Sequence, residues 1–133
     1  MDYNSQYSFE RIDIETLVGK TITTIKQEDK QDLYFTCSSG EQYMLGHYQD
    51  CCEDVIIEDI CGDLDDLIGS PIVMAEEVSS EDPDDFDKDK YDSYTWTFYK
   101  LGTAKGTVTI RFFGSSNGYY SESADLFEIK KWD

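Results

Sequence analysis

Apolar and polar residues alternate along much of this chain. The alternation is clearest in residues 94–100 (YTWTFYK) and 107–113 (TVTIRFF), which flank a glycine-containing turn, Gly102–Gly106. Successive side chains of a strand point to opposite faces of the sheet, so a period of two predicts half-buried strands. We therefore predict an antiparallel hairpin here. The residues expected to share a face are Trp96 and Phe98 on the first strand, and Val108, Ile110 and Phe112 on the second.

Similar patterns predict further strands before and after this hairpin. Five are expected upstream, at Gly19–Gln27, Asp32–Ser38, Tyr43–His47, Val55–Ile60 and Ile72–Val78. Gly40 suits a turn between the second and third of these strands. A last strand is expected at Ala124–Ile129. Because the segments are short and separated by turn-forming residues, antiparallel pairing is favoured.

One short segment has helical spacing instead. Leu64, Leu67 and Ile68 stand three and four positions apart between Gly62 and Gly69, which predicts one or two helical turns. The predicted fold class is therefore α+β, predominantly antiparallel β-sheet with one or two short helices. A length of 133 residues suits a single domain, 1–133.

Negative charge changes this picture, because it is both large and local. The chain has 29 acidic and 11 basic residues, a net charge of −18, and residues 50–92 alone contain 17 acidic residues and two lysines. Within them, Ser79–Ser93 is almost entirely polar, so we predict an exposed acidic loop there. This charge disfavours direct binding of nucleic acid, whose phosphates are held by Lys and Arg, and of anionic membranes. A partner protein with a basic surface is expected instead.

The first ten residues lack the basic and then apolar layout of a signal peptide, and no apolar run approaches the roughly 20 residues of a membrane span. A cytoplasmic location is therefore expected. The four cysteines then favour reduced thiols over structural disulfides.

The densest group of reactive side chains lies in HYQDCCED, residues 47–54. A metal site or a Cys/His-dependent centre would use His47, Asp50, Cys51, Cys52 and Glu53. Adjacent cysteines lack the two-residue spacer typical of zinc chelation, so zinc would require Cys37 or Cys61 to join them. The alternative is a structural role, because cysteine often packs as a small hydrophobe. No familiar catalytic or phosphate-binding signature occurs, so we expect neither an enzyme nor a cofactor.

A concentrated acidic surface can imitate the phosphate backbone and occupy a basic cleft. The candidate partner-binding residues are Asp82, Asp84, Asp85, Asp87 and Asp89 in the loop, and Asp63, Asp65 and Asp66 near the helical turn, with Glu58 and Asp59 beside them. The competing interpretation is that the acidity serves only solubility.

Two stretches carry a family resemblance: HYQDCCEDVIIEDICGDLDDLIGSPIVMAEEVSS and TWTFYKLGTAKGTVTIRFFGSSNGYYS. Across residues 47–121 the chain resembles a family of small uncharacterised proteins encoded by bacteriophages and prophages. The resemblance implies an accessory protein acting in the bacterial cytoplasm, where such proteins often inhibit host enzymes or antiviral defence. It implies no catalytic residues.

The leading hypothesis is therefore a phage-encoded acidic binding protein that inhibits a host factor, such as a defence nuclease or CRISPR-type effector, by nucleic-acid mimicry or occlusion. Two alternatives stay open besides the residue 47–54 centre. One is an anti-defence protein that sequesters a signalling nucleotide, which requires Lys100, Lys105 and Arg111 to converge on one pocket. The other concerns assembly, because a homo-oligomer is compatible with the sequence.

Overall fold

Nine strands and two short 3-10 helices form the described part of the chain. The computed structural model describes residues 7–47, 54–81, 93–116 and 123–131. The strands are β1 (Tyr7–Ile12), β2 (Ile22–Glu28), β3 (Asp32–Cys37), β4 (Gln42–Gly46), β5 (Asp54–Cys61), β6 (Met74–Glu81), β7 (Ser93–Thr103), β8 (Gly106–Ser116) and β9 (Asp125–Lys131). The 3-10 helices are η1 (Ile14–Leu17) and η2 (Leu64–Leu67).

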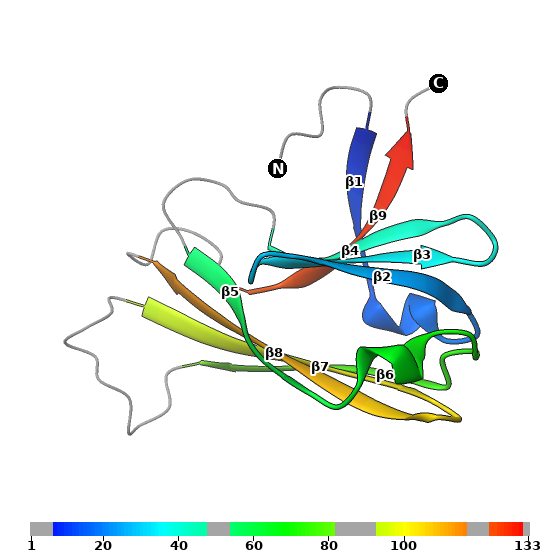
Figure 1. Ribbon diagram of the computed structural model, residues 1–133. Coiled ribbons are helices and arrows are strands. Elements are labelled where there is room, and N and C mark those ends of the chain that lie inside the picture. The colour runs from blue at the N-terminus through cyan, green and yellow to red at the C-terminus, as the bar shows by residue number, and fades with distance from the viewer. Residues whose placement is uncertain (1–6, 48–53, 82–92, 117–122, 132–133) are drawn as a thin grey trace.

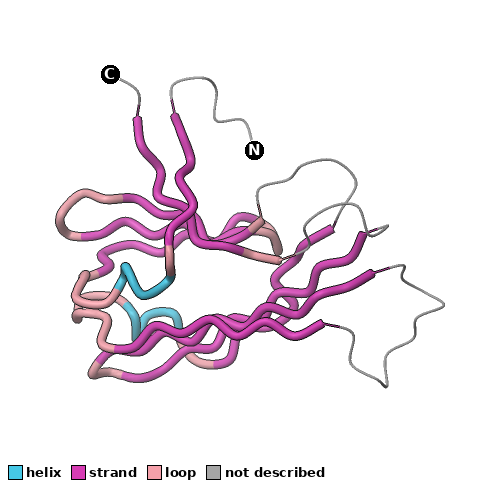
Figure 2. Tube along the Cα trace, turned by 180° about the vertical axis from the view of Figure 1, so that it is seen from behind, coloured by secondary structure: helices cyan, strands magenta, loops and turns pink. Residues whose placement is uncertain are grey.

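The strands pair into two antiparallel sheets that lie one above the other (Figure 1). The first sheet has the order β1-β9-β4-β3-β2, and the second has the order β5-β8-β7-β6. Figure 2 shows the two layers from behind, with both 3-10 helices between them at one end. The fold is therefore mostly antiparallel β, which confirms the predicted class; its helical content is the two 3-10 turns, with no helix of seven residues or more in the described ranges.

A single hydrophobic cluster joins the facing sides of the two sheets. It contains residues of both sheets and of both 3-10 helices, among them Leu17, Phe35, Leu45, Leu67, Tyr99 and Phe112, all at most 1% exposed. Hydrogen bonds also cross between the sheets: the Tyr99 hydroxyl donates to the Ala124 carbonyl at 2.6 Å, and the Gly69 N–H donates to the Ile22 carbonyl at 2.9 Å. Burial of this apolar surface is the main force that holds the layers together.

The predicted hairpin is confirmed; one of its two faces is buried between the sheets, and the other faces outward. Val108, Ile110 and Phe112 are completely buried between the sheets. Trp96 and Phe98 share the other face and are only half-buried, on the outer side of the second sheet. The strand β7 instead contributes Thr97, Tyr99 and Leu101 to the interior.

The structure corrects two boundaries and adds two elements. Strand β6 runs through Glu81 and β7 begins at Ser93, so the two ends of the predicted loop 79–93 are strand. The middle of that loop, residues 82–92, lies outside the described residues. Neither β1 nor η1 was predicted. Strand β1 has a mixed sequence, YSFERI, and it pairs with β9 more than 110 positions later in the chain.

Candidate functional site

Acidic side chains follow one edge of the second sheet. Strand β5 is an outer strand of that sheet, and it leads directly into η2. We call the six carboxylates on this segment the β5–η2 edge; they are Asp54, Glu58, Asp59, Asp63, Asp65 and Asp66. Five of the six residues are exposed, and Asp66 is half-buried. The structure thus gathers Asp63, Asp65 and Asp66 with Glu58 and Asp59, as the sequence suggested.

Local hydrogen bonds hold the end of this edge in place. Asp63 precedes η2, and its carboxylate accepts a hydrogen bond from the Asp65 N–H at 3.0 Å, which is the usual way in which aspartate caps a helical turn. The Thr103 hydroxyl donates to the Asp66 carbonyl, and Lys105 Nζ donates to the Ile68 carbonyl at 2.8 Å. Both donors come from the β7–β8 hairpin, so the tip of that hairpin fixes the acidic turn.

Basic groups offset only part of this charge. The Arg111 guanidinium pairs with the Glu58 carboxylate. Arg111 also lies over the Trp96 ring, with its central carbon 5.4 Å from the ring centroid. The guanidinium is therefore held between an acidic group and an aromatic face. Asp59, Asp63 and Asp65 remain exposed to solvent.

The other predicted carriers of negative charge cannot be placed. Asp82, Asp84, Asp85, Asp87 and Asp89 all lie outside the described residues, so the acidic-loop prediction stays a prediction.

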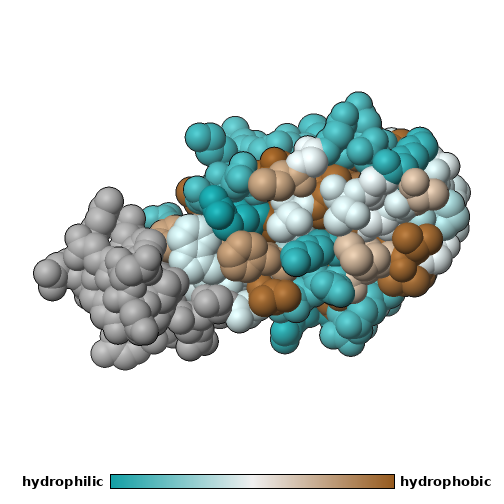
Figure 3. All heavy atoms as spheres, turned by 90° about the horizontal axis from the view of Figure 1, so that it is seen from below, coloured by the Kyte–Doolittle hydropathy of each residue, from teal (hydrophilic) through white to brown (hydrophobic). Residues whose placement is uncertain are grey.

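Aromatic side chains lie next to the β5–η2 edge, on the outer face of the second sheet. The Trp96 ring packs against Phe113 with centroids 4.7 Å apart and against Phe98 at 6.5 Å. Ile56 of β5 is paired with Phe113, and Val78 of β6 is paired with Phe98, so apolar side chains cross the whole sheet. Figure 3 shows this face, with hydrophobic atoms in brown among hydrophilic atoms in teal.

Sequence reasoning missed this apolar row. The alternation in β7 and β8 showed that Trp96 and Phe98 share a face, but it did not say that this face is the outer one. Phe113 could have been placed with them by counting one residue on from the buried Phe112. Aromatic side chains such as Trp96, and arginine side chains such as Arg111, are common at the centres of protein interfaces.

The candidate metal centre is only partly described. His47 is half-buried, and its Nδ1 lies 3.1 Å from the Ser123 carbonyl oxygen. Asp50, Cys51, Cys52 and Glu53 lie outside the described residues. Elemental analysis of the purified protein and of its C51S/C52S variant would test a metal there.

The two described cysteines, Cys37 and Cys61, lie at strand ends away from His47. His47 follows β4 at the end where Leu45 pairs with Leu33, whereas Cys37 lies at the other end of β3. Cys61 likewise lies at the far end of β5. Asp54, at the other end of that strand, is nearer to His47 in the chain. Both cysteines are free, and the pKa of each thiol is raised: that of Cys37 by burial and that of Cys61 by its hydrogen bond to Asp59. A raised pKa disfavours the thiolate that ligation or nucleophilic attack requires.

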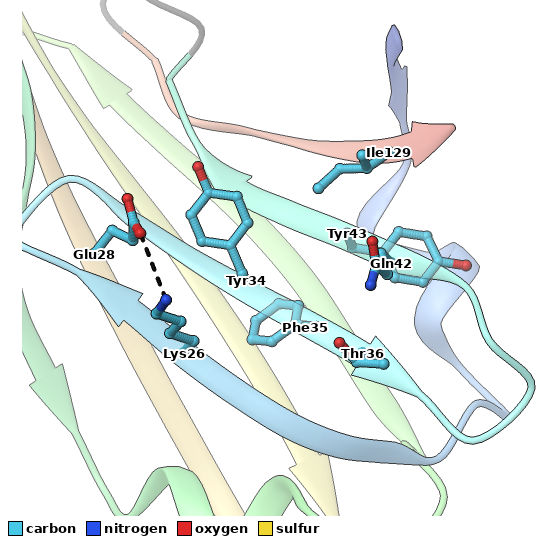
Figure 4. A pocket seen from close by; sticks show the side chains of 8 residues that line it. All are labelled: Lys26, Glu28, Tyr34, Phe35, Thr36, Gln42, Tyr43 and Ile129. Atoms are coloured by element: carbon cyan, nitrogen blue, oxygen red, sulfur yellow. Dashed lines mark ion pairs between the residues drawn. The ribbon is translucent and has the colours of Figure 1, made fainter. Parts of the chain in front are cut away.

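A shallow hollow of about 150 Å³ lies on the outer face of the first sheet. Figure 4 shows its lining: Lys26 and Glu28 from β2, Tyr34, Phe35 and Thr36 from β3, Gln42 and Tyr43 from β4, and Ile129 from β9. Lys26 and Glu28 form an ion pair at 3.8 Å along its rim. Cavities that enclose small-molecule ligands usually measure about 300–1,000 Å³, so this hollow is smaller than such a site.

The basic residues required for nucleotide capture do not converge. Arg111 is paired with Glu58, and Lys105 Nζ lies at the hairpin tip on the Ile68 carbonyl. Lys100 is exposed in the middle of β7, opposite Thr109. None of the three lines the hollow on the first sheet. The geometry therefore gives no support to the nucleotide-sequestering alternative.

In the ranges that the structure covers, no helix has the length and apolar character needed to cross a membrane.

Comparison with protein families gives one match. A family described as a domain of unknown function (DUF7448) matches residues 15–126, from η1 to the beginning of β9. The chain belongs to this family. No curated protein and no solved structure matches it.

Proposed function

We propose that this member of the DUF7448 family is a non-catalytic binding protein whose β5–η2 edge docks on a basic surface of a partner protein. The observation that supports this function is the set of six carboxylates between Asp54 and Asp66, on an outer strand and on the turn that follows it. Complementary potentials steer two proteins together and disfavour partners of the same charge.

The shape of the edge supports the proposal as well. The carboxylates stand on a strand and on a turn whose backbone the β7–β8 hairpin fixes, so little backbone freedom is lost on binding. The apolar row with Trp96 and Phe98 lies on the adjoining face of the sheet. A partner reaching from the edge onto that face would bury aromatic surface inside a charged rim, as stable interfaces commonly do.

The finer form of the proposal is that the protein comes from a phage, acts in the bacterial cytoplasm, and inhibits a host nuclease or CRISPR-type effector. In this form the carboxylates stand in for nucleic-acid phosphates, or the protein occludes the nucleic-acid site. Two observations support it: the resemblance of residues 47–121 to phage and prophage proteins, and the net charge of −18.

The test compares two variants with the same change in net charge. D63N/D65N/D66N neutralises the η2 part of the edge, and Asn at position 63 can still cap the turn. D13N/E15Q/D29N neutralises three exposed carboxylates elsewhere. Tagged wild-type and variant proteins are used to capture partners from bacterial lysate, and the captured proteins are identified by mass spectrometry.

We expect the wild type and the D13N/E15Q/D29N control to retain the same basic partner, and the edge variant to lose most of it. Double-stranded DNA should release the partner, because its phosphates compete with the β5–η2 edge for the partner's basic surface. Raised salt should release it as well, because it screens the charges of both surfaces. Equal retention by the edge variant would show that this edge is not the binding surface. Retention that neither salt nor DNA reduces would contradict mimicry.

A further inference from the structure

Strand β6 is the other outer strand of the second sheet, and it is unusually regular for an edge. Among the described strands it pairs with β7 alone, in an unbroken register from Met74–Gly102 to Glu81–Thr95. Residues Glu76–Ser79 are exposed at four consecutive positions, and η1 also packs against the strand. An edge of this kind presents unpaired backbone N–H and C=O groups on its outer side.

The other outer strands have features that oppose strand addition. The pairing of β2 shifts register between Ile22 and Thr24. The pairing of β5 shifts between Ile57 and Asp59, and the Ile57 N–H is already bound by the Lys30 carbonyl. Strand β1 is shorter, and its neighbouring Glu10 and Arg11 side chains form ion pairs with β9. Bulges and charged pairs of this type are known to block edge-to-edge pairing.

Apolar side chains also reach the β6 edge. Val73 and Val78 are 65% and 49% exposed, which makes them two of the four exposed large hydrophobic residues in the described ranges. Val78 is paired with Phe98, whose ring stacks on Trp96. The apolar row of the outer face therefore continues as far as β6 and ends there at solvent.

Charge selects the kind of segment that this edge would accept. Glu76 is exposed beside Val78 on the outer face, and Glu77 points to the inner side. The pKa of Glu77 is raised, first by burial and then by the nearby Asp125 carboxylate. Asp125 and Asp13 outnumber the one cation that acts on Glu77, Arg11, so a further cation beside it would be favourable. A second copy of the chain, paired antiparallel across this edge, would bring the glutamates of the two copies together. A basic segment avoids that repulsion.

We propose that β6 binds an extended basic segment of a partner protein by β-strand addition. The added strand runs antiparallel, as every pair in both sheets does. From its N-terminus to its C-terminus, the added strand places one apolar residue opposite Val78 and then two basic residues opposite Glu77 and Glu76. Main-chain hydrogen bonds supply affinity, and the alternating side chains supply specificity. This surface is separate from the β5–η2 edge, which lies at the opposite side of the same sheet.

The probe is a synthetic peptide with the core TVRKTV, which matches this register from Ser79 to Met74. A second peptide has the same side chains but N-methyl groups at alternate amides, which removes main-chain donors and keeps the charge. Binding is measured by calorimetry, and the affected backbone amides are located by NMR. E76K tests the charge on β6, and E28K makes the same charge change at an exposed position of the first sheet, outside both proposed binding surfaces.

We expect the unmodified peptide to perturb β6 and β7 amides, and N-methylation to weaken binding about tenfold or more, through lost hydrogen bonds. E76K should weaken binding by a similar factor, and E28K should leave it within about twofold, because residue 28 lies on the other sheet. Equal binding of the two peptides, or no binding at all, would overturn strand addition. A dimer of the protein alone would also overturn it if protection of backbone amides from hydrogen exchange placed the dimer contact at β6. A second copy of the chain would then be the occupant.

Failure of this proposal and failure of the proposed function are distinguishable. No peptide binding by the wild type, with partner capture that still depends on the β5–η2 edge, would refute strand addition alone. Peptide binding at β6, with equal partner capture by wild type and D63N/D65N/D66N, would refute the proposed role of the β5–η2 edge alone.

Discussion

Asp32 begins β3 with its carboxyl group buried against Gly46 of the neighbouring strand β4. A Cβ atom on Gly46 would lie 2.1 Å from Asp32 Oδ1, so glycine at that position makes room for the carboxyl. Burial, together with the nearby Glu28 carboxylate, raises the pKa of Asp32 from 3.8 to about 6. A buried carboxylate is costly when ionised, because it has lost its hydration.

This environment predicts how stability depends on pH. Because the folded pKa is above the unfolded one, the protonated form of Asp32 favours folding, and this stability is lost as pH rises from about 4 to about 6. D32N removes the ionisation. We expect the variant to be more stable than wild type by about 2–3 kcal/mol near neutral pH, with the difference shrinking towards pH 4. Urea unfolding at several pH values measures it, and a difference that does not change with pH would contradict the assignment.

At the scale of elements, the corner between β5 and η2 depends on Gly62. Its φ is +113°, and a Cβ there would lie 2.7 Å from the Thr107 carbonyl oxygen. Gly40, in the turn between β3 and β4, has a similar φ of +100°, but a Cβ there would meet no atom within 4 Å. An L residue would therefore be strained at either position, and only Gly62 is also in a close backbone contact.

We predict that G62A destabilises the protein more than G40A does. G40A should cost about 1 kcal/mol from backbone conformation alone, and G62A about 2–4 kcal/mol, because the clash moves the β5–η2 edge or the hairpin. Denaturant unfolding of both variants gives the comparison. If the two losses were equal, the contact with β8 would not be what requires glycine at the corner.

At the same scale, the elements were largely predictable. Alternation placed the strands of the hairpin and most others within a few residues, and the spacing of Leu64, Leu67 and Ile68 located η2. Strand β1 was not predictable, because YSFERI has weak alternation and its pairing partner, β9, is distant in sequence. The candidate edge was suggested by clustered acidic residues, whereas its rigid support by Thr103 and Lys105 required the folded hairpin.

For the whole molecule, 29 acidic and 11 basic residues leave a net charge of −18 even if every basic residue is paired. The pairs of Lys130 with Glu10 and of Lys26 with Glu28 are exposed, and exposed ion pairs contribute little stability. Repulsion among the unpaired carboxylates should therefore affect the free energy of unfolding more than attraction within the exposed ion pairs does.

This balance predicts that added salt stabilises the protein. Raising NaCl from about 20 mM to about 300 mM shortens the screening length and weakens the repulsion. We expect the free energy of unfolding to rise by about 1 kcal/mol near neutral pH, and by less at a pH close to the sequence pI of 4.1. Thermal or urea unfolding at several salt concentrations checks it. A decrease with salt would mean that attractive pairs outweigh the repulsion.

The sequence by itself determined which residues share a face, where turns interrupt the strands, and that negative charge is concentrated between Asp50 and Asp92. These are local properties, set by the period of two in a strand and by the residues themselves. Only the tertiary structure decided that Trp96 and Phe98 face outward, and that β5 and β6 are outer strands. A strand becomes an edge, and a face becomes the outer one, through pairing with distant segments and packing of one sheet on the other, which local patterns do not encode.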